Sequence, residues 1–266
     1  FNNQELAHIF KSWNEGELYS YLIGITAGIF READDLGDGE LIDRIKDSAK
    51  QKGTGRWASI EALKQGVDIS MITSACTARI MSNHLDEREK AWQLIHSPAV
   101  GLSPDKESFA AMVREALYTG KIIAYAQGFS LMQDASRLYG WNLDLGKIAS
   151  IFRAGCIIQA VFLNDITHAF EAEPKPENLI FDGFFLSRIN EHQDSLRQAV
   201  STGVMNGLPI PALCNAVSYL DEFRAKAAGA NLIQAQRDCF GAHTYERTDH
   251  EGVFHHEWRW ANDNQH

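Results

Sequence analysis

The chain has 266 residues, of which 45% are hydrophobic and 23% are charged, and its formal net charge is −10. This length can bury a large core, and the composition is ordinary for a soluble globular protein. The negative charge argues against a surface that binds nucleic acid by neutralising phosphates, and an anionic substrate would need a local cluster of cations. No apolar run reaches the length of a membrane span and no signal-peptide pattern is found, so we expect a cytoplasmic protein without membrane contacts.

The cysteines are far apart and none forms a CxxC motif. They are Cys76, Cys156, Cys214 and Cys239, and all but the last lie in apolar helical context. This spacing predicts reduced core thiols of a cytosolic protein, with disulfides or metal ligands as the alternatives.

Hydrophobic periodicity predicts helices along almost the whole chain. Apolar residues recur at spacings of three and four from Leu18 to Phe30 and from Ile69 to Ile80. The longest predicted helix starts at Ser103-Pro104, an N-cap followed by a proline at the first helical position, and stops near Gly140. Later helices are expected at 144–154, 158–172, 183–206 and 210–236. Only Val253-Phe254-His255 favours an extended segment, so the sequence predicts an all-α fold.

The order of helices raises the question of an internal duplication. Glu17–Ala91 and Asp182–Phe240 each combine a long helix, a break centred on glycine and a second amphipathic helix. This pattern indicates a helical duplication, although short helical repeats also look alike by chance. The first residues resemble a cap entering a helix and the chain starts at Phe1 without a methionine, so we expect a fragment of a longer protein.

The end of the chain differs from the rest in composition. We predict one helical domain over residues 1–247 and a C-terminal tail over 248–266. The tail is polar, lacks a helical period and carries Trp258 and Trp260. Large aromatic side chains are rarely left in solvent, so we expect the tail to dock on another surface such as a second subunit.

A short polar segment, Gln51-Lys52-Gly53-Thr54-Gly55-Arg56-Trp57, interrupts two apolar helical stretches. Its glycines let the backbone approach a ligand and leave several N–H groups pointing the same way. A helix expected to start at Trp57 adds its positive dipole end, Lys52 adds a charge and Thr54 adds a hydroxyl. The segment is a candidate phosphate site, and a surface turn that caps the helix is the alternative.

Arg79 lies between Ala78 and Ile80 on a mostly apolar helical run. A buried or half-buried guanidinium needs a partner, because an uncompensated charge in a core is costly. That partner is either a structural carboxylate or a bound phosphate, and the sequence does not decide between them.

A second polar motif runs from Gln236 to Glu246. Arg237 and His243 lie on either side of a break at Gly241 and could reach one site at the end of a helix. The alternatives are a cation that compensates the negative helix end and a structural histidine at an interface. The histidines near residues 250–256 lack a carboxylate–cysteine set, so no metal site is predicted. No nucleophilic triad, close carboxylate pair or dinucleotide-binding glycine motif stands out, so no catalytic or cofactor-binding residue is predicted.

Taken in order, these motifs resemble the C-terminal, all-helical domain of 6-phosphogluconate dehydrogenase. The resemblance extends over essentially the whole chain. The segments that carry it are Phe10–Asn14, Arg44–Ala49, Gln51–Trp57, Ala78-Arg79, Lys121–Phe129, Arg153–Ile158, Gln193–Ser195, Ala199–Gly203 and Leu232–Glu246.

The resemblance implies an enzyme that oxidises and decarboxylates 6-phosphogluconate with NADP to give ribulose 5-phosphate. It implies a homodimer in which a Rossmann domain precedes the helical domain. Lys52, Thr54 and Arg79 match substrate-binding positions. Arg237 and His243 match positions that reach the active site of the partner subunit, and the tail is expected to thread into that partner.

The chain also departs from the family pattern. The base, the acid and the cofactor fingerprint of the family belong to a segment before Phe1, so we expect the isolated chain to be inactive. Cys239 replaces a frequent aromatic, and the tail after Phe254 differs from the glycine-rich ending of many members. The alternatives are a non-catalytic helical dimerisation protein that retains the sugar-phosphate site, and a different hydroxyacid dehydrogenase with a related helical domain.

Overall fold

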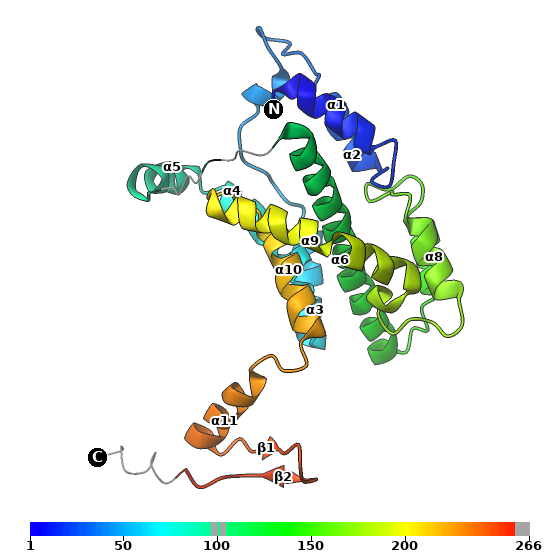
Figure 1. Ribbon diagram of the computed structural model, residues 1–266, viewed down its shortest axis with the longest axis vertical. Coiled ribbons are helices and arrows are strands. Elements are labelled where there is room, and N and C mark those ends of the chain that lie inside the picture. The colour runs from blue at the N-terminus through cyan, green and yellow to red at the C-terminus, as the bar shows by residue number, and fades with distance from the viewer. Residues whose placement is uncertain (97–100, 102–104, 259–266) are drawn as a thin grey trace. The chain divides into compact units, whose positions relative to one another are not determined.

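A computed structural model describes residues 1–96, 101 and 105–258 (Figure 1). The chain forms two compact units, Phe1–Ser218 and Tyr219–His266. Within the described residues the only strands are two short segments of the second unit, so the fold is all-α as the periodicity predicts.

The first unit is built from helices and two short 3₁₀ turns, and its last helix continues into the second unit. These elements are α1 (Asn3–Trp13), α2 (Tyr21–Ile29), η1 (Leu41–Arg44), α3 (Thr54–Gln65), α4 (Ser70–Ser82), α5 (Leu85–Leu94), α6 (Lys106–Tyr139), α7 (Leu145–Ile151), α8 (Leu163–Glu171), η2 (Leu179–Phe181), α9 (Gly183–Met205) and α10 (Pro211–Arg224). None of the helices in the described ranges has the length and apolar composition that crossing a bilayer requires.

The core of the first unit is organised around α6, which has 34 residues. Ile122 and Ile123 are both 0% exposed, and such neighbours point in different directions on a helix, so α6 is covered on more than one face. α9 makes the most extensive contact with it, crossing it at a large angle (Figure 1). A Cβ atom at Gly120 would lie 2.8 Å from the Leu213 side chain, so the absence of a side chain there lets α10 come close.

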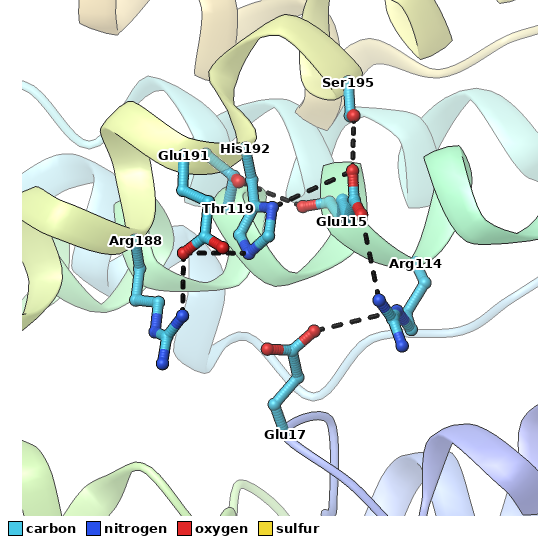
Figure 2. Close-up of polar contacts among 8 residues, drawn as sticks. All are labelled: Glu17, Arg114, Glu115, Thr119, Arg188, Glu191, His192 and Ser195. Atoms are coloured by element: carbon cyan, nitrogen blue, oxygen red, sulfur yellow. Dashed lines mark hydrogen bonds and ion pairs between the residues drawn. The ribbon is translucent and has the colours of Figure 1, made fainter.

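A network of polar side chains joins α6, α9 and the loop before α2 (Figure 2). Ser195 Oγ donates to Glu115 Oε2 at 2.5 Å, and the buried His192 has Nδ1 at 3.8 Å from the same oxygen. Arg114 Nε lies 3.7 Å from Glu17 Oε1 of the loop. Because the serine donates to the carboxylate and not to the histidine, the cluster is a structural link between helices and no nucleophilic triad.

The helix boundaries agree with the expected ones in part. The periodic segments ending at Phe30 and Ile80 form α2 and α4, and α6 ends where Gly140 adopts a left-handed conformation. Its N-cap is Asp105, whose side chain accepts from the Ser108 N–H at 2.9 Å; the predicted start at residues 103–104 lies outside the described residues.

Several predicted boundaries were wrong. The helix expected at 210–236 is two helices, because α10 ends at Arg224 and Gly229, with φ 79°, precedes the next helix. The helix expected at 158–172 begins only at Leu163, because Ala160 forms a β-bridge with Ser20 instead. The helix expected at 144–154 ends at Ile151.

The two segments expected to form an internal duplication differ in their helices. Residues 182–240 contain the long helix α9, whereas no helix within 17–91 exceeds the 13 residues of α4, so the duplication stays a prediction.

The four cysteines are free, as expected. Only Cys76 is buried, because the other three lie in half-covered positions, so the expectation of four core thiols was wrong.

The second unit contains α11 (Ala230–Gly241) and an antiparallel hairpin of β1 (Tyr245–Glu246) and β2 (Val253–Phe254). The extended conformation predicted for 253–255 is confirmed for the two strand residues. Trp258 follows the hairpin, and Trp260 lies outside the described residues.

Asp238 of α11 holds the hairpin through four hydrogen bonds. Its side chain is 0% exposed and accepts from the backbone N–H groups of Thr244 at 3.1 Å and His256 at 3.0 Å. His255 Nδ1 and Trp258 Nε1 lie 2.8 and 2.9 Å from its two oxygens. Burial alone would raise the pKa of Asp238, but the hydrogen bonds outweigh it and hold the pKa far below its ordinary value of 3.8.

We predict that Asp238→Asn loosens the hairpin. The asparagine amide keeps the shape of the aspartate side chain but loses the negative charge that strengthens the hydrogen bonds. Its NH₂ group would also face N–H donors, with which it cannot form a hydrogen bond. Hydrogen exchange at the Thr244 and His256 amides should accelerate by roughly 10- to 100-fold. Asp249→Asn is the matched control, since Asp249 pairs with Arg247 at an exposed site and should leave these amides unchanged.

The same carboxylate predicts a pH dependence. A lowered folded-state pKa means that its contribution to stability is complete above the ordinary pKa and is lost as pH falls towards the folded value. Protection of the two amides should therefore decrease on acidification below about pH 4 in the wild type, and much less in Asp238→Asn. Equal acid sensitivity of the two proteins would contradict this role.

Candidate substrate-binding site

The first unit contains a pocket of about 740 Å³. Its polar wall is the segment 50–55, which follows η1 and includes the first residues of α3, and its other walls come from α4, from Ala124 of α6, from Ile157 and from Ala212 of α10. Lys52, Thr54 and Arg79, which the sequence singles out in two separate motifs, all line this pocket.

The polar wall ends at the start of α3. Gly53 has φ 100°, a left-handed conformation that a side chain would strain, and its carbonyl accepts from the Trp57 N–H at 3.0 Å. The helix therefore begins at Thr54 and not at the predicted Trp57. The first N–H groups of a helix have no acceptor within it, and no side chain caps α3. These N–H groups and the helix dipole make this end favourable for an anion.

Side chains of α4 hold the segment in place. Cys76 Sγ donates to Gln51 Oε1 at 3.0 Å, and a Cβ atom at Gly55 would lie only 3.4 Å from this sulfur. A nitrogen of Arg79 donates to the Lys50 carbonyl. Gly55 thus allows α3 and α4 to approach, and Arg79 both supports the loop and lines the pocket.

Arg79 differs from its expected setting. The side chain is exposed and donates to a backbone carbonyl, so the expected buried or half-buried setting was wrong, and of its two expected partners the structural carboxylate is not found among the described residues. The physical reason is that α4 presents this position to the pocket and not to the core. Within the described ranges no acidic side chain forms an ion pair with it.

The pocket is locally positive in a chain of net charge −10. Lys50, Lys52 and Arg79 line it, and neither an aspartate nor a glutamate does. Among the described residues no carboxylate pairs with the exposed Lys52. The arrangement provides cations, a hydroxyl and backbone N–H groups for a phosphate, next to apolar side chains such as Met71 and Ile72.

Arg237 and His243 lie in the second unit, near the C-terminal end of α11. The helix ends at Gly241, where the sequence places a break between the two residues. Arg237 is exposed and donates to Gln234 Oε1 at 3.1 Å, and the exposed His243 contacts the edge of Phe240. A Cβ atom at Gly241 would lie 2.7 Å from the His243 ring, so a side chain there would displace this ring from its present position.

The structure therefore brings three of the five predicted residues into one pocket and the other two to one end of α11. Sequence reasoning missed Lys50, Cys76 and Asp238, because their roles depend on contacts between segments far apart in the chain. Among the described residues no group of histidines, cysteines and carboxylates is arranged to hold a metal ion.

Comparison with known proteins places these features in a family. The family model of the C-terminal domain of 6-phosphogluconate dehydrogenase matches residues 1–258. The decarboxylating 6-phosphogluconate dehydrogenase of Lactococcus lactis subsp. lactis is 48% identical over 97% of this chain and 54% of its own length. The corresponding protein of Staphylococcus aureus (strain N315) is 47% identical over 97% of this chain and 55% of its length.

A solved structure agrees with these matches. The 6-phosphogluconate dehydrogenase of Plasmodium falciparum, studied in its apo form and in complex with NADP⁺ or 6-phosphogluconate, superposes with a TM-score of 0.93. It is 41% identical, and the match covers 97% of this chain and 56% of that protein. The chain spans about half the length of these relatives. It belongs to the 6-phosphogluconate dehydrogenase family, of which it represents the C-terminal domain.

Proposed function

We propose that this chain binds 6-phosphogluconate as the substrate-binding and dimerising part of an NADP-dependent decarboxylating dehydrogenase. The observation that carries the proposal is the pocket in which Lys52, Thr54 and Arg79 meet at the uncapped start of α3. The Plasmodium falciparum relative binds the same sugar phosphate, which supports this choice of ligand. We place the protein in the cytoplasm, where this sugar phosphate would be metabolised.

The phosphate is assigned to the cationic end of the pocket. Lys52 and Arg79 would each give it a charge-assisted hydrogen bond, and Thr54 would donate its hydroxyl. The apolar wall next to them would limit access of water and so strengthen these contacts. The carbon chain of the sugar acid would extend away from this anchor towards the reacting groups.

A second copy of the chain would complete the site. Arg237 and His243 are exposed polar groups that no carboxylate holds within the described ranges, and we assign them to the active site of the partner subunit. Arg237 would add a third cation for the phosphate. The hairpin that Asp238 holds would keep α11 and the following tail in shape for docking on the partner.

The reacting groups and the cofactor site are assigned to the remaining length of the enzyme. NADP, when bound there, accepts the hydride, and the base and the acid for decarboxylation and tautomerisation would come from the same part. The pocket lining includes neither a histidine nor a carboxylate, so this chain contributes binding and orientation.

We predict that Lys52→Met and Arg79→Met weaken binding of 6-phosphogluconate by roughly 10- to 100-fold each, because each removes a charge-assisted hydrogen bond. The change in affinity is measured by calorimetric titration of 6-phosphogluconate into the full-length enzyme that contains this chain. Lys64→Met is the matched control, since Lys64 lies on α3 and pairs with Glu61 at an exposed site away from the pocket. Unchanged affinity in both pocket variants would refute the assignment.

Two glycine variants separate loop geometry from general strain. Gly53→Ala and Gly66→Ala both place a side chain in a left-handed conformation, at opposite ends of α3. Both should lower the melting temperature by a few degrees, at about 1–2 kcal/mol of strain. Only Gly53→Ala should also weaken substrate binding, by roughly tenfold, because it moves the N–H groups of the pocket. Equal affinities would show that the loop conformation is irrelevant to binding.

The isolated 266-residue chain should not reduce NADP in the presence of 6-phosphogluconate. Its pocket has binding groups without the base, acid and cofactor site assigned above. Absorbance of NADPH over several hours is the measurement, with a full-length relative as positive control. Turnover that grows with the concentration of the chain would contradict the assignment, whereas binding without turnover would support it.

A further inference from the structure

The chain enters the candidate pocket through residues 47–51, which have no regular secondary structure. Among the described residues, no backbone–backbone hydrogen bond reaches residues 49–52. Three side chains hold this segment instead: Ser82, which is the last residue of α4, its C-cap Asn83, and Arg88 of α5. None of the three lines the pocket. We refer to these three residues as the clip.

Ser82 and Asn83 bridge the same two backbone positions. Ser82 Oγ accepts from the Ala49 N–H at 3.0 Å and donates to the Arg79 carbonyl at 2.8 Å. Asn83 Nδ2 donates to the Ala49 carbonyl at 3.2 Å and to the Arg79 carbonyl at 2.7 Å. Asn83 Oδ1 also accepts from Ser48 Oγ at 2.9 Å. The backbone of the segment is therefore tied to the backbone of a residue that lines the pocket.

Arg88 holds the start of the same segment. Its Nη1 donates to the Asp47 carbonyl at 3.1 Å and to the Ser82 carbonyl at 3.3 Å, and its Nη2 lies 2.6 Å from Asp47 Oδ2. One guanidinium thus joins the segment to the end of α4. Capping of α4 explains the bonds to the Arg79 and Ser82 carbonyls, because the last carbonyls of a helix lack partners within it. It does not explain the bonds to Asp47 and Ala49.

A repulsion between the pocket cations accounts for those further bonds. Lys50 and Lys52 follow the clipped residues in the chain, and both line the pocket together with Arg79. Like charges repel, so without an anion this segment would move away from α4. The bridges of Ser82 and Asn83 oppose that movement. A phosphate then meets cations at a spacing that is already set, which reduces the entropy lost on binding.

We propose that the clip is a positioning element of the substrate site, which sets the spacing of Lys52 and Arg79 for the phosphate without touching the substrate. The proposal rests on the proposed function, in which these two cations bind the phosphate of 6-phosphogluconate. It adds to that function three residues outside the pocket on which the affinity depends.

Ser82→Ala tests the clip, because it removes the acceptor of the Ala49 N–H and leaves every charge of the pocket in place. In the full-length enzyme that contains this chain, the variant should weaken binding of 6-phosphogluconate by roughly three- to tenfold. The value of kcat should change little, since the phosphate anchor serves the ground state and the transition state alike. Ser82→Thr keeps a hydroxyl and should retain the wild-type affinity.

Ser150→Ala is the matched control. Ser150 Oγ donates to the carbonyl of Lys147, three residues earlier near the end of α7, just as Ser82 donates to Arg79. Among the described residues no N–H group donates to Ser150 Oγ. The control should therefore keep the wild-type affinity, whereas equal losses in both serine variants would show a general effect on helix ends and overturn the proposal.

A double-mutant cycle tests whether the serine acts through the cations. In an Arg79→Met background, Ser82→Ala should weaken binding by less than about twofold, because the spacing between Lys52 and Arg79 no longer matters. Full additivity of the two changes would overturn the proposal. If Lys52→Met and Arg79→Met weaken binding and Ser82→Ala does not, the clip is refuted and the phosphate site stands. If none of the three changes weakens binding, the phosphate site itself is refuted.

Hydrogen exchange at the Ala49 amide, measured without substrate, tests the bridge independently of binding. This amide should exchange several-fold faster in Ser82→Ala than in the wild type, and at the wild-type rate in Ser82→Thr and Ser150→Ala. Unchanged exchange in Ser82→Ala would mean that the serine does not hold the segment, and the proposal would fail.

Discussion

Burial of α6 on several faces is the constraint on which the rest of the first unit depends. Ile122 and Ile123 are neighbours on α6 and both are fully buried, so more than one other element must pack against this helix. α9 covers one side, and Gly120 lets Leu213 of α10 come close on another. The candidate substrate pocket lies against this framework through Ala124.

Charges on this framework fall into two kinds. At the junction of α6 and α9, Glu115 is surrounded by Ser195, His192 and Arg114, so a half-buried carboxylate is compensated within the unit (Figure 2). Around the pocket the cations have no such carboxylates among the described residues. The pocket cations Lys52 and Arg79 are exposed and free of carboxylate partners in the described part of the chain, which agrees with the proposed phosphate site.

The polar wall of the candidate pocket is a segment that neighbouring helices hold in place. The segment 50–55 has no secondary structure before Thr54, yet α4 restrains it through Cys76 and Arg79. Ordering of this kind before the ligand arrives reduces the entropy lost on binding. In the second unit Asp238 has the corresponding role, since one buried carboxylate orders the turn and the hairpin that follow α11.

By itself the sequence determined the helical class, the end of α6 at Gly140 and the side chains whose chemistry suits a phosphate. These depend on local periodicity, on the conformational freedom of glycine and on side-chain chemistry, all of which are short-range properties. It also carried the resemblance to the family, because many ordered motifs recur along the chain.

Only the tertiary structure decided the rest. It showed that Lys52 and Arg79, 27 positions apart in the chain, line one pocket, and that Arg79 is exposed. It revealed that Asp238 binds four donors from the following segment. Each of these features depends on which segments of the chain come into contact. Hydrophobic periodicity predicts which face of a helix is buried, but it does not predict which other segment covers that face.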